Sequence, residues 1–341
     1  MKKLFIISNE SVFNYEGNFF CDNLDMKSTP EGLSKNFEVK LISRKSNKIR
    51  SHKINIKNIN IFSNIFSFLY EIIQSTKEKE SKYLIISISP YTFFASIFLN
   101  ILKKKPIVYL RSDGYSEYKS IMGFIGPVIY HLMFTVVAKI SFLISCRNYI
   151  LKGKKGEIIS PSQLSNDWKN NINLKGKNID KIKLLYVGRI KVEKGIYSLL
   201  EILKRNTEIS LSIVGAEKMS KHKINQNNIK IYEIENNEKN LIKLYDDHNI
   251  FVLPSFTEGH PMALLEALSR LRPVIIFKDI EHVIGNKKGI FVANRNSESF
   301  FKKIDYIKKN YEKIQDEMKK NKLPTKDIFL KEFKDLILKS F

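Results

Sequence analysis

Short apolar runs alternate with longer amphipathic stretches through the first half of the chain. Four runs are apolar on successive residues, which is typical of parallel strands buried on both faces of a sheet. They are residues 3–7, 37–42, 83–88 and 107–110. Residues 62–76 and 91–103, between these runs, have the pattern of helices. This alternation predicts a doubly wound α/β domain.

The alternation stops at a polar passage rich in Asn and Lys, residues 162–181, and then begins again. Strands are predicted at residues 182–187, 209–214, 229–234, 250–253 and 274–277. Helices are predicted at residues 196–203, 238–245 and 261–271. The pattern therefore predicts a second Rossmann-like domain.

A chain of 341 residues exceeds the size at which one core usually keeps growing, so two domains are expected. We assign residues 1–165 to the first domain, 166–181 to a linker and 182–320 to the second domain. We expect residues 321–341, in the Lys-rich amphipathic tail, to form a helix that packs back on the first domain. Two parallel sheets then face a cleft at the carboxyl ends of their strands, where ligands bind in open α/β folds.

Residues 121–146 are the one stretch of the sequence that resembles a membrane span. A span needs about 20 continuous apolar residues. This stretch is interrupted by Gly123, Gly126, Pro127, His131 and Lys139. The interruptions favour a buried or interfacial helix over a span, and whether this helix touches a membrane is left open.

The formal net charge of +23 is the strongest bulk feature. Such a charge suggests nucleic acid, an anionic membrane surface or phosphorylated ligands as partners. Lysines are spread along the chain, however, and Lys, Ile and Asn are all abundant, so a bias toward AT-rich codons explains the charge equally well. The 2 cysteines form no CxxC pair, and residues 1–8 are typical of a first strand rather than a secretory signal. Both observations indicate a reducing, cytosolic compartment.

A strand, a loop and a helix meet at the segment Glu258-Gly259-His260-Pro261. Pro261 has the fixed φ favoured at the first position of a helix and needs no N–H partner there. The next three backbone amides then lack helical partners, and the helix dipole adds partial positive charge beside them. Because Gly259 also lets the loop approach a ligand closely, this junction is suited to bind phosphate.

Two carboxylates flank the junction, Glu258 in the loop and Glu266 in the helix. Positions this far apart on a helix are displaced by about 80° and about 12 Å. Since Glu258 lies in a loop, both can contact one extended ligand with several hydroxyls. Two alternatives stay open: Glu258 is a carboxylate placed for the helix dipole, and Glu266 pairs with Arg270 at i,i+4. Against the second, Glu266 interrupts an otherwise apolar helix, where a carboxylate needs a partner.

A second strand, residues 184–187, runs into a loop that carries Gly188, Arg189, Lys194 and Gly195. Two cations at the carboxyl end of a strand are placed to bind a diphosphate, and the glycines give the backbone freedom. In a chain this rich in lysine, solvated surface cations are the alternative. Gly215 ends a further strand, but no GxGxxG follows any strand, which disfavours NAD or FAD chemistry.

These motifs together resemble the carboxy-terminal domain of the retaining GT-B glycosyltransferases of family 4. The resemblance is carried by three motifs in the order and spacing of that family. They are Val187-Gly188-Arg189 with Lys194-Gly195, then Ile213-Val214-Gly215, and then Leu253-Pro254-Ser255 with Glu258, Pro261, Glu266-Ala267 and Pro273-Val274-Ile275.

The resemblance implies a GT-B fold in which the first domain binds the acceptor and the second binds a nucleotide sugar. It implies that Arg189 and Lys194 bind the donor diphosphate, that Glu258 is catalytic and meets the donor sugar, and that Glu266 meets the ribose. The other expected donor-site residues supply backbone amides or close approach; they are Gly188, Gly215, Gly259, His260, Pro261, Met262 and Ala263.

The sequence also departs from the family. Leu271 stands where relatives often have glycine, and residues 279–282 replace a glycine-rich loop. The first half matches only loosely, through residues 85–91 and 106–114, and lacks the usual histidine. Ser112 or Asp113 is a candidate to face the sugar, and Gly17 is a candidate to approach the phosphate. A structural role is the alternative for each of the three.

The expected activity is transfer of a sugar, with retention, from a UDP- or GDP-sugar to a glycan or polyprenyl-diphosphate-linked acceptor in bacterial surface polysaccharide synthesis. No DxD motif and no His/Cys cluster is present, so we expect neither metal nor cofactor. The expected location is the cytoplasmic face of the inner membrane, with peripheral contact to anionic lipid and no nucleic-acid partner. The alternatives are another GT-B reaction, such as a nucleotide-sugar epimerase or phosphorylase, a catalytically silent relative, or a basic nucleic-acid-binding protein.

Overall fold

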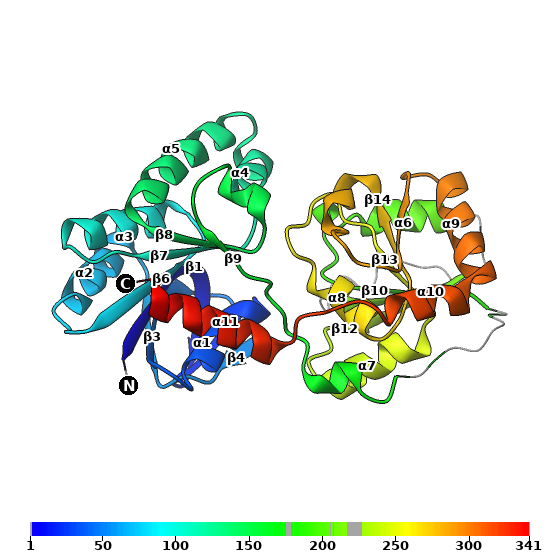
Figure 1. Cartoon of the computed structure of the whole chain (residues 1–341), viewed down its shortest axis with the longest axis horizontal. Coiled ribbons are helices and arrows are strands. Elements are labelled where there is room, and N and C mark those ends of the chain that lie inside the picture. The colour runs from blue at the N-terminus through cyan, green and yellow to red at the C-terminus, as the bar shows by residue number, and fades with distance from the viewer. Residues whose placement is uncertain are drawn as a thin grey trace. The chain divides into compact units, whose positions relative to one another are not determined.

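Two compact units make up the chain, and each contains a largely parallel β-sheet between helices (Figure 1). The computed structural model describes residues 2–172, 174, 179, 181–204, 206, 208–216 and 227–340. The first unit comprises Met1–Gln163 and Lys326–Phe341, and the second is Leu164–Thr325. The second unit is therefore an insertion between two parts of the first.

The sheet of the first unit is parallel through the order β5-β3-β1-β6-β7-β8-β9. Its strands include the four apolar runs expected from the sequence. The parallel strands are β1 (Lys3–Tyr15), β3 (Glu38–Ser46), β5 (Asn58–Phe62), β6 (Ser81–Ile86), β7 (Ile107–Leu110), β8 (Phe142–Ser145) and β9 (Glu157–Ile158). Leu4 and Ile6 of β1 pack into one core and Phe5 and Ile7 into another, so both faces of the sheet are buried.

Strand β1 continues past its parallel partners and folds back on itself. It pairs antiparallel with β2 (Asn18–Cys21), and β4 (His52–Ile54) pairs with β2 in turn. The turn between β1 and β2 is Glu16 and Gly17, whose φ values are 50° and 77°. Two left-handed residues between antiparallel strands form a type I′ hairpin turn. Gly17 thus has a structural role in this turn.

Helices cover both faces of the first sheet. On one face lie α2 (Ile65–Ser75), α3 (Pro90–Ile101) and α5 (Ile125–Ile140), and on the other lie α1 (Leu24–Leu33) and α11 (Lys326–Lys339). The C-terminal helix α11 thus packs on the first unit. The rings of Phe333 and Tyr109 are 4.9 Å apart, and the Leu330 side chain lies against the backbone of Gly32.

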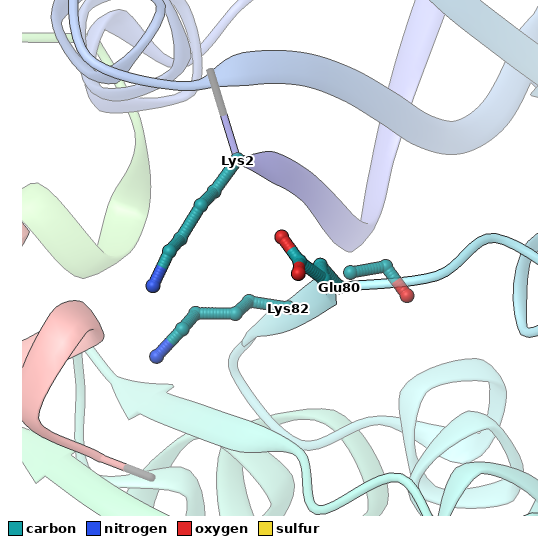
Figure 2. Close-up of a pocket in the computed structure, with 4 residues that line it drawn as sticks. Lys2, Glu80 and Lys82 are labelled. Carbon is teal, nitrogen blue, oxygen red and sulfur yellow. The ribbon is translucent and has the colours of Figure 1, made fainter.

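Lys82 caps the end of α11 at the edge of the sheet where the parallel strands begin. Its Nζ donates to the carbonyl oxygens of Ile337, at 2.7 Å, and Leu338, at 3.3 Å. A cation near the last carbonyls of a helix is favoured by the helix dipole. Figure 2 shows Lys2, Glu80 and Lys82 around a pocket at this edge, which is opposite to the carboxyl ends of the strands.

The apolar stretch at 121–146 is not one helix. It contains the end of α4 (Gly114–Met122), all of α5 and the buried strand β8. Gly123 has a φ of 64° and breaks the first helix, and extended backbone at Ser141 ends the second. A short apolar run has no periodicity that distinguishes a buried strand from a helix, so β8 was not predicted from the sequence. Within the described residues, no helix is both long and apolar enough to cross a membrane.

The second unit has a parallel sheet in the order β12-β11-β10-β13-β14-β15. Its strands are β10 (Lys183–Val187), β11 (Ser210–Ala216), β12 (Ile229–Glu233), β13 (Ile250–Leu253), β14 (Val274–Phe277) and β15 (Ile290–Ala293). Its helices are α6 (Ile196–Leu203), α7 (Glu238–Asp247), α8 (Met262–Ser269), α9 (Ser297–Lys309) and α10 (Tyr311–Met318). The strand β15 was not expected from the sequence.

The segment expected as a linker is in part a packed element of the second unit. Trp168, in the short helix Asn166–Lys169, is buried against Tyr245 at a ring distance of 5.4 Å. The buried guanidinium of Arg270 donates to the carbonyls of Trp168, Asn170 and Asn171. Residues 173, 175–178 and 180 of the expected linker lie outside the described residues.

Leu271 ends α8 in the left-handed region, with a φ of 54°. This geometry explains why glycine suits the position. We predict that Leu271→Gly lowers the free energy of unfolding by about 1–2 kcal/mol, because losing a buried leucine costs about 2–3 kcal/mol and relief of the left-handed strain returns about 1 kcal/mol. Leu271→Ala loses nearly the same burial but keeps the strain, so it should be less stable than the glycine variant by about 1 kcal/mol. Urea denaturation of the three proteins gives the order, and an alanine variant more stable than the glycine variant would contradict the strain.

Candidate active site

Adjacent parallel strands bring two loops together in the second unit. β10 pairs with β13, so the loop after Val187 and the loop after Leu253 leave the same edge of the sheet. Gly195, with a φ of 66°, lies so close to the second loop that a Cβ would stand 1.9 Å from the carbonyl oxygen of Pro254. Any side chain at this position would push the two loops apart.

A second close approach joins the loop after β10 to the end of β11. Gly188 donates its N–H to the carbonyl of Val214 at 2.9 Å. Gly215 has a φ of 115°, and a Cβ there would lie 2.5 Å from the carbonyl oxygen of Gly188. Glycine at 215 is thus required by a backbone contact, whereas at Gly188 a Cβ would lie 2.8 Å from the hydroxyl of Tyr186.

Lys194 and Glu258, which the sequence assigned to the diphosphate and the sugar, form an ion pair. The distance from Lys194 Nζ to Glu258 Oε1 is 2.7 Å, and the side chains are 23% and 10% exposed. Ser255 Oγ donates to the same Oε1 at 2.7 Å. The second carboxylate oxygen of Glu258 has no hydrogen-bond partner among the described residues, so it is available to a ligand.

Arg189 presents an exposed cation on the loop that also carries Lys194. Its side chain is exposed and forms no ion pair within the described part of the chain. Its backbone is fixed, because the hydroxyl of the buried Tyr186 donates to the Arg189 carbonyl at 2.8 Å. A fixed backbone under an exposed guanidinium is an arrangement suited to bidentate contact with a phosphate.

The helix α8 begins at Met262, one residue later than predicted, because Pro261 is its N-cap with extended backbone rather than its first helical residue. No side chain caps its first amides. Gly259 and His260 lie in the preceding loop, and Met262 and Ala263 are half-buried at the helix start. Residues 279–282, which replace a glycine-rich loop, fall in the 3-10 helix Lys278–Val283. From this helix, the Nε2 of His282 lies 2.7 Å from the carbonyl oxygen of Glu258 and supports the loop.

Glu266 lies half-buried on α8 and accepts a hydrogen bond at 2.8 Å from the hydroxyl of Tyr245. Burial raises the pKa of Glu266 to about 7, against the hydrogen bond from Tyr245, which lowers it. The alternative of an i,i+4 ion pair is wrong, because the Arg270 guanidinium pairs with Asp246, with Nε–Oδ1 and Nη2–Oδ2 distances of 3.0 and 2.6 Å.

Arg295 holds the loop that carries Glu258, and its role was not predicted from the sequence. Its guanidinium carbon lies 3.9 Å from the ring centre of Phe256 and 4.4 Å from that of Phe277. Its nitrogens donate to the carbonyls of Pro254, at 2.8 Å, and Ser255, at 3.2 Å. It also pairs with Asp279 at 2.7 Å. Because its loop partners are carbonyl groups, no pattern of side chains marks Arg295.

The candidates from the first half of the sequence belong to the first unit. Asp113 is the N-cap of α4, where its carboxylate accepts from the Tyr115 N–H at 3.1 Å and pairs with Lys152 at 3.4 Å. Ser112 precedes it and Gly17 forms the hairpin turn. Across the described residues, no group of three or more His, Cys, Asp and Glu side chains is arranged to hold a metal ion.

The raised pKa of Glu266 has a consequence for stability. Since the folded-state pKa of about 7 exceeds the ordinary value of 4.5, the folded protein holds this proton more tightly than the unfolded chain. The contribution of Glu266 to the free energy of unfolding therefore falls as pH rises from about 4.5 to about 7, by about 3 kcal/mol. Urea denaturation at a series of pH values should show this decline in the wild type and a smaller one in Glu266→Gln. Equal pH dependence in the two proteins would rule out the shift.

Removal of the Arg295 guanidinium should loosen the Glu258 loop. Arg295→Met keeps an unbranched apolar stem but loses the guanidinium, with its hydrogen bonds and its ion pair. We predict at least about tenfold faster amide exchange across residues 255–260, equivalent to about 1.4 kcal/mol of local stability. Exchange in β6 and β7 of the first unit serves as the internal control. Unchanged exchange in the loop would show that Arg295 does not hold it.

Known proteins share both the sequence of the second unit and the fold of the whole chain. Residues 167–323 match the family described as glycosyl transferases group 1. The capsular polysaccharide biosynthesis glycosyltransferase CapM of Staphylococcus aureus is 23% identical over 312 residues, which cover 80% of this chain and 81% of CapM. The putative teichuronic acid biosynthesis glycosyltransferase TuaC of Bacillus subtilis is 32% identical over 101 residues, which cover 29% of this chain and 25% of TuaC.

The structure of the Anabaena protein HepE, in complex with UDP and glucose, superposes with a TM-score of 0.69 at 10% identity and covers 99% of this chain and 100% of HepE. This likeness concerns the fold, two Rossmann-like units with parallel sheets. The chain is therefore a glycosyltransferase of the GT-B fold, and its residues 167–323 match the glycosyl transferases group 1 family.

Proposed function

We propose that this glycosyltransferase transfers a sugar, with retention at the anomeric carbon, from a UDP- or GDP-sugar to a glycan or lipid-linked glycan. The observation that carries the proposal is the group formed by Lys194, Glu258 and Ser255, beside the exposed Arg189 and the uncapped start of α8. It combines cations for a diphosphate with a carboxylate for a polyhydroxylated sugar.

The leaving group of the proposed reaction is a nucleoside diphosphate, so negative charge builds on its oxygens as the bond to the anomeric carbon breaks. Arg189, Lys194 and the amides of Met262 and Ala263 supply positive charge and donors for this diphosphate. We propose that these groups take the place of a divalent metal and that the enzyme needs no cofactor.

Glu258 is the proposed catalytic residue. Its Oε1 is held by Ser255 and Lys194, which leaves Oε2 to position the sugar and to face the positive charge that develops on the ring. Glu266 is the proposed ribose contact. Its carboxylate is on α8, whose first amides are proposed to bind the diphosphate, and its orientation is fixed by the hydrogen bond from Tyr245. Gly259, His260 and Pro261 shape the loop between the two carboxylates.

CapM and TuaC bear names that refer to capsular polysaccharide and teichuronic acid biosynthesis, which supports a bacterial surface polysaccharide as the product class. We propose that the acceptor is the growing glycan, carried on a polyprenyl-diphosphate lipid. The enzyme then works at the cytoplasmic face of the inner membrane, in peripheral contact with anionic lipid, and nucleic acid is not its partner.

Glu258→Gln tests the assignment because it keeps the shape of the side chain and removes its charge. We expect turnover to fall by about 100-fold or more, with nearly unchanged affinity for the nucleoside diphosphate. A thermal-shift panel of UDP-, GDP- and ADP-sugars first identifies the donor, because a bound ligand raises the stability of the fold by mass action. Single-turnover kinetics and a binding titration with that donor then separate the two effects.

Glu201→Gln is the matched control, since this glutamate lies on α6 of the same unit and its side chain is 73% exposed. It should behave as the wild type. Wild-type turnover in Glu258→Gln would remove Glu258 from the mechanism, and no stabilisation by any nucleotide sugar would contradict the proposed donor class. Product analysis with and without acceptor distinguishes transfer from epimerisation or phosphorolysis.

A further inference from the structure

An apolar stripe runs along the outer side of the hairpin formed by α4 and α5. The inner side of α5 packs into the core of the first unit through Tyr130, Met133, Phe134 and Val137. The outer side exposes large apolar side chains to solvent, with Phe124 at the tip 86% exposed. These side chains are Ile121, Met122, Phe124, Ile125, Val128 and Leu132.

The spacing of these residues makes the stripe continuous. Ile125, Val128 and Leu132 follow one another at helical intervals of three and four, so they share one face of α5. The outer side of α5 also exposes His131 and Lys139, and an exposed apolar stripe beside polar residues is typical of a helix that lies at a membrane interface. Contiguous exposed apolar surface of this kind marks an interaction site.

The hairpin is held rigidly, so the stripe is a fixed feature of the unit. At Gly126 a Cβ would lie 2.0 Å from the carbonyl oxygen of Tyr118, and at Gly114 a Cβ would lie 2.1 Å from the ring of Tyr130. The two helices therefore touch through glycines at both places. The rings of Tyr115 on α4 and Tyr130 on α5 also pack against each other, with their centres 4.9 Å apart.

The charge around the stripe is net positive. Residues 113–157 include Asp113, Glu117 and Glu157 as their acidic residues, against six basic residues, namely Lys119, Lys139, Arg147, Lys152, Lys154 and Lys155. Asp113 pairs with Lys152 at 3.4 Å, whereas Lys154 and Lys155 have no such partner among the described residues. Lys152 lies beside the start of α4, with its Nζ 5.2 Å from the ring centre of Tyr115. Lys154 and Lys155 follow it on the surface. An apolar stripe with basic neighbours complements an anionic lipid surface.

The length of α5 limits how deep such contact goes. Its 16 residues extend about 24 Å, which is less than the roughly 30 Å of a bilayer's hydrocarbon core, and one side is already buried in protein. The helix can therefore lie at the interface but cannot cross it.

We propose that the α4–α5 hairpin is the membrane-docking element of this protein. Its apolar stripe enters the boundary between headgroups and acyl chains, and Lys152, Lys154 and Lys155 contact anionic headgroups. The proposal rests on the proposed function to the extent that docking brings the enzyme to the surface where a lipid-linked acceptor lies. The docking itself requires only the hairpin and an anionic bilayer.

Flotation of the full chain with phosphatidylglycerol and phosphatidylcholine vesicles tests the proposal. The triple variant Phe124→Ser/Val128→Ser/Leu132→Ser should bind phosphatidylglycerol vesicles at least about tenfold more weakly than the wild type, because each lost side chain removes apolar burial. Since all three side chains are exposed, the fold should be unaffected. Lys154→Gln/Lys155→Gln should weaken binding to phosphatidylglycerol at low salt and leave binding to phosphatidylcholine unchanged.

A matched control removes three apolar side chains of similar exposure from α2 and α3. Phe66, Tyr70 and Ile101 are 82%, 63% and 65% exposed, against 86%, 60% and 64% for Phe124, Val128 and Leu132. The variant Phe66→Ser/Tyr70→Ser/Ile101→Ser should float as the wild type does. Equal loss in the two triple variants, or no loss in the first, overturns the assignment of docking to the hairpin.

Sedimentation without lipid covers the competing occupant, a second copy of the chain. The proposal is overturned if the wild type does not bind vesicles and forms a dimer that is lost in the hairpin variant. The stripe would then be an interface between protomers. Thermal shifts with UDP and GDP separate docking from the proposed function. If neither nucleotide stabilises the protein while flotation still depends on the stripe, the proposed donor class fails and the docking element stands.

Discussion

The geometry of the candidate site depends on the contact between Gly195 and the carbonyl of Pro254. Parallel pairing of β10 with β13 brings their loops to one edge of the sheet, but the pairing does not fix how close the loops come. The absence of a side chain at Gly195 sets that distance. Lys194 is the neighbour of Gly195, and the Glu258 loop begins at Pro254, so the 2.7 Å ion pair is a consequence of this backbone contact.

A buried charged cluster supports the site from the other end of α8. Asp246 on α7 accepts from both Arg270 and Arg272, whose side chains are 1% exposed. Buried ion pairs are weak evidence for stability, because desolvation offsets the attraction. Here the cluster also satisfies the carbonyls of Trp168, Asn170 and Asn171, so its effect is to fix one path for the chain that enters the unit. The helix α8 therefore has the proposed phosphate-binding amides at its start and a rigid anchor at its end.

Much of the second unit could be predicted from sequence because its elements are local and strongly patterned. β13, β14 and α6 have the bounds that their apolar runs indicate, and the loop motifs place Lys194 and Glu258 in facing loops. Features that depend on distant partners could not be predicted. Arg295 binds backbone carbonyls, which leave no mark in the sequence. The antiparallel strands β2 and β4 are 4 and 3 residues long, too short for a pattern to show in the sequence.

The position of α11 has a consequence for synthesis of the protein. Phe329, Phe333 and Ile337 complete a core whose other members come from residues 4–159. While the ribosome is still making the second unit, α11 has not yet been synthesised. The residues of the first sheet that α11 later covers, such as Tyr109, are therefore still exposed. The second unit is continuous in sequence and can close its own core before the last helix emerges. The unit that is begun first is therefore the one that is completed last.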